Sequence, residues 1–235
     1  MPEIGLPASV EHFTDPRLGE DLLWREVRIA RFPRPVPALF LDRDGVIVEE
    51  RIYLSDPRDV KLLPGIVELI RAARALNMPV VEITNQAGIA HGHFTWSDFV
   101  RVENELTRIL DEHGVAVDAV LACPYHPQGR PPYKKPDHPW RKPNPGMLLE
   151  AGRLLNLNLK SSVLVGDKVA DLEAARNARL ACGIQVLTGH GKEHTSACAA
   201  LNSNEFPVHI VPGAGDAIPF LRQAAIADWE PPVSA

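Results

Sequence analysis

Two aspartates, one residue apart at the end of an apolar run, are the residues in this chain best suited to chemistry. Residues 38–46 read Ala-Leu-Phe-Leu-Asp42-Arg-Asp44-Gly-Val. An apolar run without alternation favours a buried parallel strand, and open α/β sheets carry their chemistry at the carboxyl ends of such strands. Two carboxylates that lose water there repel each other, so they need a cation, most simply Mg²⁺ with oxygen ligands. The alternative is a structural pair of aspartates in a strand-to-helix turn.

Three further segments place polar side chains where strands end or a helix begins. Thr84, Asn85 and Gln86 end a predicted strand that begins Val80-Val81-Glu82-Ile83, Asp167 and Lys168 follow 163–166, and Arg141-Lys142 precedes a predicted helix. A carboxylate nucleophile, with a hydroxyl, an ammonium group and a metal ion to neutralise the transferred oxygens, is typical of phosphoryl transfer.

These segments resemble, in order and spacing, the four motifs of the haloacid dehalogenase superfamily of phosphatases. The matching residues are Asp42-x-Asp44-x-Val46, Thr84, Lys142 and Gly166-Asp167-x-x-x-Asp171. Longer stretches are similar to the family of heptose-1,7-bisphosphate 7-phosphatases and its relatives, the histidinol-phosphate phosphatases. They are Asp42-Arg-Asp-Gly-Val, Thr84-Asn-Gln-Ala-Gly-Ile-Ala, Cys123-Pro-Tyr-His-Pro-Gln-Gly, Arg141-Lys-Pro-Asn-Pro-Gly-Met and Val165-Gly-Asp-Lys. The resemblance covers residues 37–225.

The resemblance implies a Mg²⁺-dependent phosphomonoesterase that works through an aspartyl-phosphate on a small sugar phosphate. The first choice of substrate is D-glycero-D-manno-heptose 1,7-bisphosphate, cleaved at position 7, and the second is histidinol phosphate or another sugar or polyol phosphate. A DNA 3′-phosphatase of similar fold is disfavoured by the formal net charge of −5 and by the lack of an aromatic and basic groove. A non-catalytic binding module is opposed by the complete motif set.

The resemblance also implies individual catalytic roles. Asp42 would attack phosphorus, and Asp44, protonated when the substrate arrives, would protonate the leaving alkoxide and then deprotonate water. Thr84 would donate a hydrogen bond to a phosphoryl oxygen, although Thr84 or Asn85 could also cap a following helix. Lys142 would neutralise charge on the phosphoryl group.

Metal and substrate contacts follow from the same resemblance. The metal would be held by Asp42, Asp167 and the backbone carbonyl of Asp44, while Asp171 would either orient these groups or favour a helix dipole. Arg141 could grip a second phosphate bidentately, or could be a solvated loop charge. The expected substrate-binding residues are Tyr53, Asn85, Gln86, Arg141 and Lys168.

The loop before Arg141 departs from the family. Many heptose-bisphosphate phosphatases carry a structural zinc site there, as Cys-x-His and Cys-x-Cys, whereas this chain reads Cys123-Pro-Tyr125 and His138-Pro-Trp140. A closed zinc site needs four nitrogen or sulfur donors, which tyrosine and tryptophan do not supply, so we expect no structural zinc. The prolines and stacking of Tyr125, Tyr133 and Trp140 would hold the loop instead. The alternative is a regrouped metal site of Cys123, His126 and His138, with Asp137.

Bulk properties set the class of protein. The chain has 235 residues, 45% of them hydrophobic and 23% charged, which is ordinary for a globular protein with one sizeable core. Three cysteines form no disulfide framework, so a reducing cytoplasm is expected. There is no apolar run of membrane-spanning length and no secretory signal pattern, which predicts a protein without a membrane partner. The expected partner is a small phosphorylated metabolite rather than nucleic acid, and the resemblance suggests a monomer.

The elements that must position these residues alternate between strand and helix. This alternation predicts an α/β fold: a Rossmann-like parallel sheet sandwiched by helices, with no large cap domain and only loops 45–63 and 123–144 over the site. After the first core strand, strands are expected at 79–84, 117–122, 162–166, 182–187 and 207–211. Helices are expected from Pro64 to about residue 76 and at 96–113, 145–155, 168–177 and 215–227.

The start of the chain lies outside the resemblance. We therefore divide the chain into an N-terminal extension, 1–36, and a phosphatase domain, 37–235. Residues 21–31 could form a short helix or a strand packed on the domain, and Trp24 is expected to be a packing anchor rather than a ligand contact.

Overall fold

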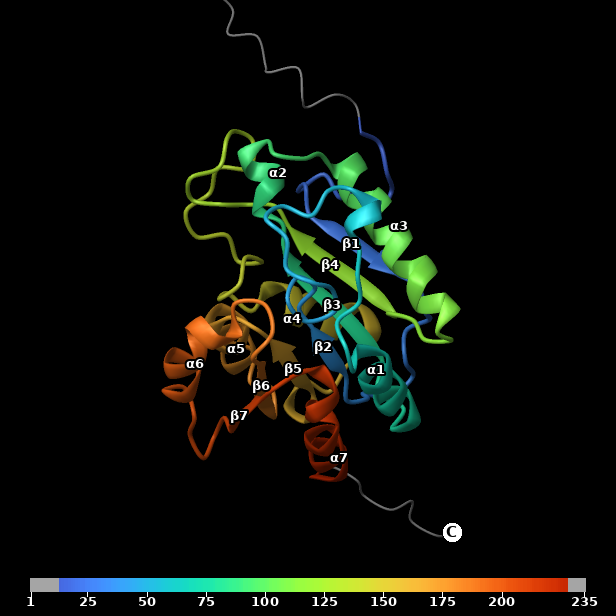
Figure 1. The fold of residues 1–235 in the computed structure, drawn as a ribbon, viewed down its shortest axis with the longest axis vertical. Helices are drawn as coiled ribbons and strands as arrows, with labels where there is room; N and C mark the ends of the chain where they lie inside the picture. Colours follow the sequence, from blue (N-terminus) through green and yellow to red (C-terminus); the bar gives the residue numbers. More distant parts are fainter. Residues whose placement is uncertain (1–12, 228–235) are drawn as a thin grey trace, which may run out of the picture.

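A twisted seven-stranded sheet forms the centre of the computed structural model, which describes residues 13–227 (Figure 1). Its spatial order is β1-β4-β3-β2-β5-β6-β7. The strands are β1 Trp24–Val27, β2 Leu39–Leu41, β3 Val80–Asn85, β4 Ala119–Cys123, β5 Val163–Gly166, β6 Cys182–Val186 and β7 Val208–Val211. The core strands predicted from the sequence are therefore confirmed, each within two residues of its expected ends.

Strand β2 lies at the point where the strand order changes direction. It pairs in parallel with β3 on one side and with β5 on the other, and Leu41 is level with Glu82 and Val165. The carboxyl ends of these three strands therefore meet at one edge of the sheet. In open α/β sheets this switch point is where ligands bind, because neighbouring crossovers lead away to opposite faces.

Helices cover both faces of the sheet, and each face has its own apolar core. Leu69, Phe99 and Leu221 belong to one core, and Leu148, Leu172 and Cys198 to the other. Helices α1, α3 and α7 thus lie on the first face, and α4, α5 and α6 on the second. The helices are α1 Ile66–Ala75, α2 Ala87–His91, α3 Trp96–Glu112, α4 Gly146–Leu155, α5 Val169–Asn177, α6 Gly191–Ala199 and α7 Ile218–Ala227.

Local sequence explains which helices were predictable. Helix α3 starts at a capping box, in which Asp98 N–H donates to Thr95 Oγ1 at 3.2 Å and Thr95 N–H donates to the Asp98 carboxylate at 2.7 Å. Helix α6 was not predicted, and α2 was considered only as the helix that Thr84 or Asn85 could cap. Helix α2 spans five residues, and α6, Gly-Lys-Glu-His-Thr-Ser-Ala-Cys-Ala, has too few large apolar residues to show a helical period.

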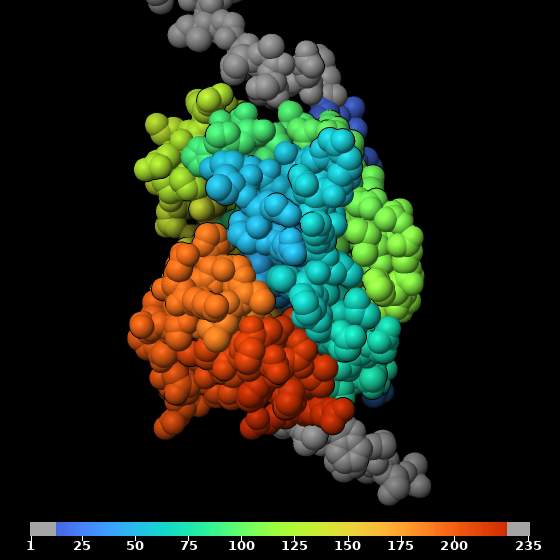
Figure 2. Space-filling model, viewed as in Figure 1, coloured from blue at the N-terminus to red at the C-terminus, as the bar shows by residue number. Residues whose placement is uncertain are grey.

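The fold class is confirmed as α/β without a large cap. Beyond the carboxyl end of β2, residues 45–63 form a loop that contains only the short 3-10 helix Pro57–Asp59. Figure 2 shows this segment, in light blue and cyan, on the surface between the green region of α2 and the orange region of α5 and α6. None of the helices in the described part of the chain is both long and apolar enough to cross a membrane.

Strand β1 adds an antiparallel edge to the sheet, so the strand alternative for residues 21–31 is the one found. Trp24 pairs with Ala122 of β4 and is fully buried. Its ring stacks on Trp96 with centroids 5.7 Å apart and meets the ring of Phe99 edge to face at 5.5 Å. Trp24 is thus a packing anchor, as predicted, and it joins the start of the chain to α3.

Candidate active site

Asp42 lies immediately after β2, at the centre of the sheet edge. Its backbone N–H donates to Val165 O of β5 at 3.0 Å, which continues the parallel ladder and fixes where the side chain emerges. The side chain is 8% exposed, and its Oδ1 accepts a hydrogen bond from Lys142 Nζ at 2.7 Å. A carboxylate held in this way has limited freedom and an adjacent positive charge.

Lys142 uses its ammonium group to join three segments. Besides Asp42, Nζ donates to Ile83 O at 2.9 Å and lies 2.6 Å from Asp171 Oδ1. The backbone of Lys142 is held in turn by Asn85, whose side-chain amide donates to Lys142 O and accepts from Lys142 N–H, each at 3.1 Å. Asn85 therefore positions the lysine, a contact that the sequence did not predict.

Three buried carboxylates come together beside the lysine. One oxygen from each of Asp42, Asp167 and Asp171 lies within 4.8 Å of the others, and no other such group of three acidic, cysteine or histidine side chains occurs in residues 13–227. Burial raises the pKa of Asp42 to about 6, against the opposing effect of Lys142. Burial, with the charges of Asp42 and Asp171, raises the pKa of Asp167 to about 8. These shifts express the cost of crowding negative charge away from water.

The donor set fits a hard divalent cation. Asp167 Oδ2 accepts the His190 N–H at 2.8 Å, whereas its Oδ1 is buried and has no hydrogen-bond partner. A buried carboxylate oxygen without a partner is costly, and a cation bound among oxygen ligands would remove that cost. The structure brings the predicted ligands Asp42 and Asp167 together and adds Asp171, while the carboxylate of Asp44 has other partners.

A close backbone approach shapes this corner of the site. Gly45 and Gly189 have φ of +86° and +54°, and a Cβ on either would lie 2.5 Å or less from Asp167 Oδ2. Thr188 Oγ1 donates to Gly45 O at 2.6 Å, so the loop after β6 is fastened to the turn after Asp44. His190, in that loop, was missed by the sequence reasoning, although Thr188-Gly-His-Gly directly after a strand was a signal.

Asp44 is held from two sides. Gln86 Nε2 donates to Asp44 Oδ2 at 3.2 Å and to Thr84 Oγ1 at 2.7 Å, and the Arg43 guanidinium binds the Asp44 carboxylate. Thr84 is 1% exposed. Helix α2 begins with Gln86 at its N-cap and has no side-chain cap, so the capping alternative for Thr84 and Asn85 is wrong.

Asp171 combines the two roles considered for it. Its Oδ1 is the oxygen that contacts Lys142, and its Oδ2 accepts the Lys168 N–H at 2.9 Å in the first turn of α5. Asp171 therefore orients Lys142 while it satisfies the start of the helix.

These groups open into a pocket of about 300 Å³. Of the predicted substrate-binding residues, Tyr53, Asn85, Gln86 and Lys168 line it, and Arg141 does not. Lys168 Nζ lies 3.4 Å from Glu50 Oε2 of the covering loop. Glu50 was not among the residues predicted for the site, because an isolated acidic residue in a loop gives no pattern.

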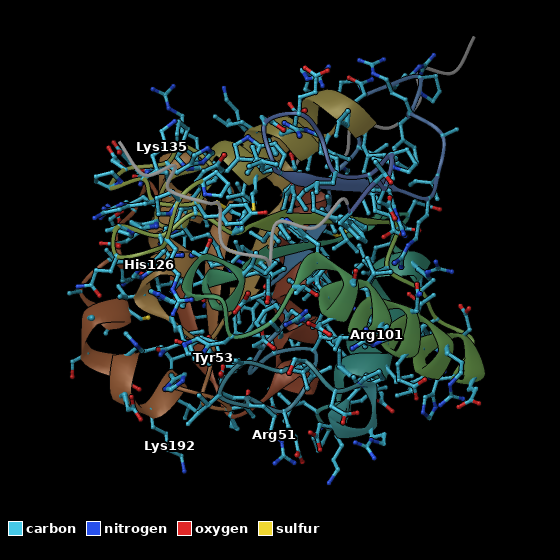
Figure 3. All side chains as sticks on the ribbon, turned by 90° about the horizontal axis from the view of Figure 1, so that it is seen from above. Arg51, Tyr53, Arg101, His126, Lys135 and Lys192 are labelled. Atoms are coloured by element: carbon cyan, nitrogen blue, oxygen red, sulfur yellow. The ribbon has the colours of Figure 1, made fainter. Side chains whose placement is uncertain are left out.

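A row of rings extends from the pocket towards the 123–144 loop. Tyr53, with φ of +59°, stacks on His93 at a centroid distance of 4.1 Å, and His91 meets His126 edge to face at 4.5 Å. Tyr53 and His126, the ends of this row, are labelled in Figure 3. Arg141 is half-buried beyond it and donates to Tyr125 O at 3.1 Å, so it is not a freely solvated charge.

The four positions aligned with the zinc ligands make other contacts. Cys123 Sγ and His138 Nδ1 are 3.9 Å apart, and Tyr125 stacks on His138 at 4.1 Å. Trp140 packs under the guanidinium of Arg25, 4.3 Å from its ring centroid. The regrouped site of Cys123, His126 and His138 with Asp137 is not assembled, because His126 faces His91 instead.

The expected stacking in this loop is found in part. Tyr125 meets Tyr133 edge to face at 6.0 Å, as predicted, but Trp140 packs against strand β1 rather than against the tyrosines. The start of the chain therefore helps to hold the loop that carries Lys142.

Comparison with known proteins identifies the family. A family model described as HAD-hydrolase-like matches residues 139–217. The D-glycero-beta-D-manno-heptose-1,7-bisphosphate 7-phosphatase of Mesorhizobium japonicum is 52% identical over 152 residues, which are 65% of this chain and 70% of that protein. This match is longer than the segment 139–217 covered by the family model.

Solved structures agree with the sequence matches. A crystal structure named as a HAD-like phosphatase from Mesorhizobium loti is 42% identical, with a TM-score of 0.77, and the match covers 89% of this chain and 96% of that one. The D,D-heptose 1,7-bisphosphate phosphatase of B. bronchiseptica, complexed with magnesium and phosphate, is 28% identical with a TM-score of 0.69, covering 80% of this chain and 99% of that one. The chain therefore belongs to the heptose-bisphosphate phosphatase family of HAD-like hydrolases, and it is a phosphatase.

Proposed function

We propose that this phosphatase uses Mg²⁺ to hydrolyse the 7-phosphate of D-glycero-D-manno-heptose 1,7-bisphosphate through an aspartyl-phosphate on Asp42. The observation that carries the proposal is the buried Asp42 carboxylate, paired with Lys142 and next to Asp167, whose Oδ1 lacks a partner. The choice of substrate is supported by the name of the Mesorhizobium japonicum relative. The free cysteines agree with action in a reducing cytoplasm.

In the first half of the reaction, an Asp42 oxygen attacks phosphorus and the bond from phosphorus to the sugar oxygen breaks. The departing oxygen takes a proton from Asp44, so it leaves as a hydroxyl group of the sugar and Asp42 carries the phosphoryl group. Lys142 opposes the effect of burial on the pKa of Asp42 and balances negative charge as the phosphoryl group arrives. Thr84, held by Gln86, has its hydroxyl at the pocket wall for a phosphoryl oxygen.

In the second half, Asp44 removes a proton from water, and the resulting hydroxide oxygen attacks phosphorus. The bond between phosphorus and the Asp42 oxygen breaks, which releases inorganic phosphate and restores both aspartates. A Mg²⁺ ion held by Asp42 and Asp167, with the Asp44 carbonyl, would supply charge neutralisation at the phosphoryl oxygens. Asp171 would act through Lys142 rather than on the substrate.

The substrate's second phosphate has a candidate cationic partner beyond the pocket wall. Within the described part of the chain, Arg141 makes no ion pair. His91 and His126 lie close enough for its positive charge to affect their pKa values. Burial and this neighbouring positive charge lower the pKa of both histidines. Three basic groups without a carboxylate partner favour a ligand that brings negative charge.

The test is phosphate release from a panel of metabolites with Mg²⁺, with and without EDTA. The panel contains both anomers of heptose 1,7-bisphosphate, histidinol phosphate and a 3′-phosphorylated oligonucleotide. We expect EDTA-sensitive turnover with the highest kcat/KM on a heptose bisphosphate. A preference for another metabolite would overturn the substrate, and turnover unaffected by EDTA would overturn the metal requirement.

The covalent step is tested with Asp42→Asn, with Asp111→Asn on the exposed side of α3 as the matched control. The Asp42 variant should lose nearly all turnover, because an amide is a poor nucleophile, and should form no acid-stable phosphoenzyme in a quench experiment. The control should retain wild-type rates. Unchanged turnover in the Asp42 variant would contradict the covalent mechanism.

A further inference from the structure

A buried arginine links the aspartate Asp44 to helix α3. The Arg43 side chain is 1% exposed, and its Nε and Nη2 donate to Asp44 Oδ1 at 3.2 and 3.1 Å. Nη2 also donates to Asp44 Oδ2 at 3.0 Å. The other arm of the same guanidinium, Nη1, donates to Glu103 Oε1 at 2.9 Å. Arg43 and Glu103 are 60 residues apart in the chain, and neither role was anticipated from the sequence.

We propose that Glu103 is a positioning residue for the phosphatase reaction: it holds the Arg43 guanidinium, which in turn fixes the orientation of the Asp44 carboxyl group. The inference rests on the proposed role of Asp44 as the proton donor to the leaving alkoxide. A guanidinium is planar and rigid, so fixing one arm fixes the direction of the other. Asp44 has its remaining side-chain contact with Gln86, which alone would leave the carboxyl group free to rotate.

The environment of Arg43 supports this assignment. Glu103 is 3% exposed at its side chain, and the Phe99 ring centroid lies 5.5 Å from Arg43 Cζ. Both residues lie on α3, whose N-terminal capping box and packing on Trp24 keep it in place. The side chain of Asp44 is thus supported from helix α3 rather than from the turn that follows β2 and contains Asp44.

A purely stabilising role explains the arrangement less well. A buried ion pair loses hydration that its attraction barely repays, and apolar residues of similar size often stabilise a core as much or more. A buried arginine with a carboxylate at each end is therefore costly for stability alone. Pre-orienting a proton donor is a benefit that apolar residues cannot supply.

Glu82, the other acidic group near Arg43, does not compete for it. Its side chain is fully buried, and neither carboxyl oxygen has a hydrogen-bond partner. Burial and the nearby charge of Glu103 raise the pKa of Glu82 well above its usual range, which favours its neutral form. The charge of Arg43 is left to Glu103 and Asp44.

A comparison of leaving groups separates this role from a structural one. An alkoxide leaving group needs a proton in the transition state, whereas p-nitrophenolate is stable without one. Loss of Asp44 orientation should therefore slow hydrolysis of an alkyl phosphate far more than that of p-nitrophenyl phosphate. A general loss of folded enzyme slows both reactions by the same factor.

The variants are Glu103→Ala, which removes the acceptor, and Arg43→Lys, which keeps the charge but not the fork. Glu103→Gln, which keeps an acceptor, tests for rescue, and Glu105→Gln on the outer side of α3 is the matched control. The measurement is kcat and KM for the best sugar phosphate and for p-nitrophenyl phosphate, with thermal unfolding of every variant. Asp44→Asn gives the reference for complete loss of the proton donor.

We expect Glu103→Ala and Arg43→Lys to lower kcat on both substrates, with a loss on the sugar phosphate that is about tenfold or more larger than the loss on p-nitrophenyl phosphate. KM should change little. The size follows because general acid catalysis contributes roughly 10²–10⁴-fold to the rate. Glu103→Gln should restore part of the difference. Suppose that Asp44→Asn slows the sugar phosphate more than p-nitrophenyl phosphate. Equal losses on the two substrates in the Glu103 and Arg43 variants, or no loss at all, would then overturn the positioning role. If Asp44→Asn also slows the two substrates equally, both the proton-donor role of Asp44 and this inference are wrong. The results of the metabolite panel and of the Asp42 variant do not depend on that outcome.

Discussion

Lys142 Nζ and Asp42 Oδ1 lie 2.7 Å apart, although 100 residues of chain separate them. The contact exists because the loop after β4 returns over the end of β3, where Asn85 holds the Lys142 backbone on both sides. It places a cation on Asp42, the proposed nucleophile, before any substrate is bound. The same ammonium group reaches Asp171, so one lysine compensates two buried carboxylates.

Replacing Lys142 by Met should abolish turnover and destabilise the fold. The substitution leaves Asp42 and Asp171 buried without their cation, and breaking a buried pair by removing one partner costs about 3–5 kcal/mol. The loss of a charge at the phosphoryl group should lower kcat by at least about 10²-fold. Steady-state kinetics and urea unfolding measure the two effects.

The matched control for Lys142 is Lys134→Met, at an exposed position in the same loop. It should change neither kcat nor the free energy of unfolding appreciably. A Lys142→Met protein with wild-type kcat would show that the ammonium group does not act on the phosphoryl group.

Asp167→Asn should weaken Mg²⁺ binding. Asp167 Oδ1 is a buried oxygen without a protein partner, and an amide offers one neutral oxygen where the carboxylate offers a charge. We expect the Mg²⁺ concentration for half-maximal activity to rise at least about tenfold. Mutation of a residue that holds a metal ligand in place commonly lowers metal affinity by that factor, and a direct ligand should matter at least as much. Calorimetric titration of Mg²⁺ into the EDTA-treated protein gives the affinity without turnover.

For this test Asp216→Asn, far along the chain in the 3-10 helix before α7, is a suitable control. Equal Mg²⁺ affinity in the Asp167 variant and the wild type would place the cation elsewhere.

Glu82→Gln should stabilise the protein increasingly as pH rises. Burial raises the pKa of Glu82 in the folded state, so the neutral form is favoured there. By linkage, the wild-type protein is as stable as the glutamine variant below the unfolded pKa of about 4.5. Its free energy of unfolding then falls relative to the variant as pH rises towards the raised folded-state pKa. The free energies of unfolding of the two proteins should agree near pH 4.5 and separate towards pH 8.

Denaturant unfolding at several pH values measures this difference, and Glu20→Gln, at an exposed position, should show no such pH dependence. A pH-independent difference between Glu82→Gln and wild type would mean that Glu82 is ionised in the folded protein.

Arg25→Ala should loosen the 123–144 loop. Arg25 stacks on Trp140 and pairs with Asp21 at 2.6 Å and with Glu150 at 3.3 Å, so it ties β1 to that loop and to α4. Its ion pairs are partly exposed and screened, so we expect a loss of about 1 kcal/mol in stability, mostly from the stacking. Faster proteolytic cleavage within the loop and a raised KM would report the loss of order.

The planar stacking predicts that Arg25→Lys will not restore the loop, because an ammonium group cannot cover the indole ring in the same way. Arg101→Ala, which breaks an ion pair within α3, is the control. Unaltered proteolysis in Arg25→Ala would show that the prolines alone hold the loop.

Much of the fold was predictable because its signals are local. The apolar runs that became β2 and β5 are short and uninterrupted, the β3 segment is interrupted only by Glu82 before Thr84, and α3 shows a helical period from Phe99 to Leu110. Helix α6 escaped because small and polar residues leave no such period. Strand β1 was ambiguous because an edge strand of four residues carries too little pattern to distinguish it from a helix.

The sequence alone indicated the residues that we assign to the chemistry, since Asp42, Thr84, Lys142 and Asp167 each stand in a motif whose type and order are readable along the chain. It did not determine their partners. The pairs Lys142–Asp171, Arg43–Glu103, Asp167–His190 and Arg25–Trp140 depend on the order β1-β4-β3-β2-β5-β6 and on the direction in which each side chain leaves its element. Local periodicity reports the face of an element but not its neighbour, so contacts between distant segments, and the pKa shifts they cause, were set only when the sheet brought those segments together.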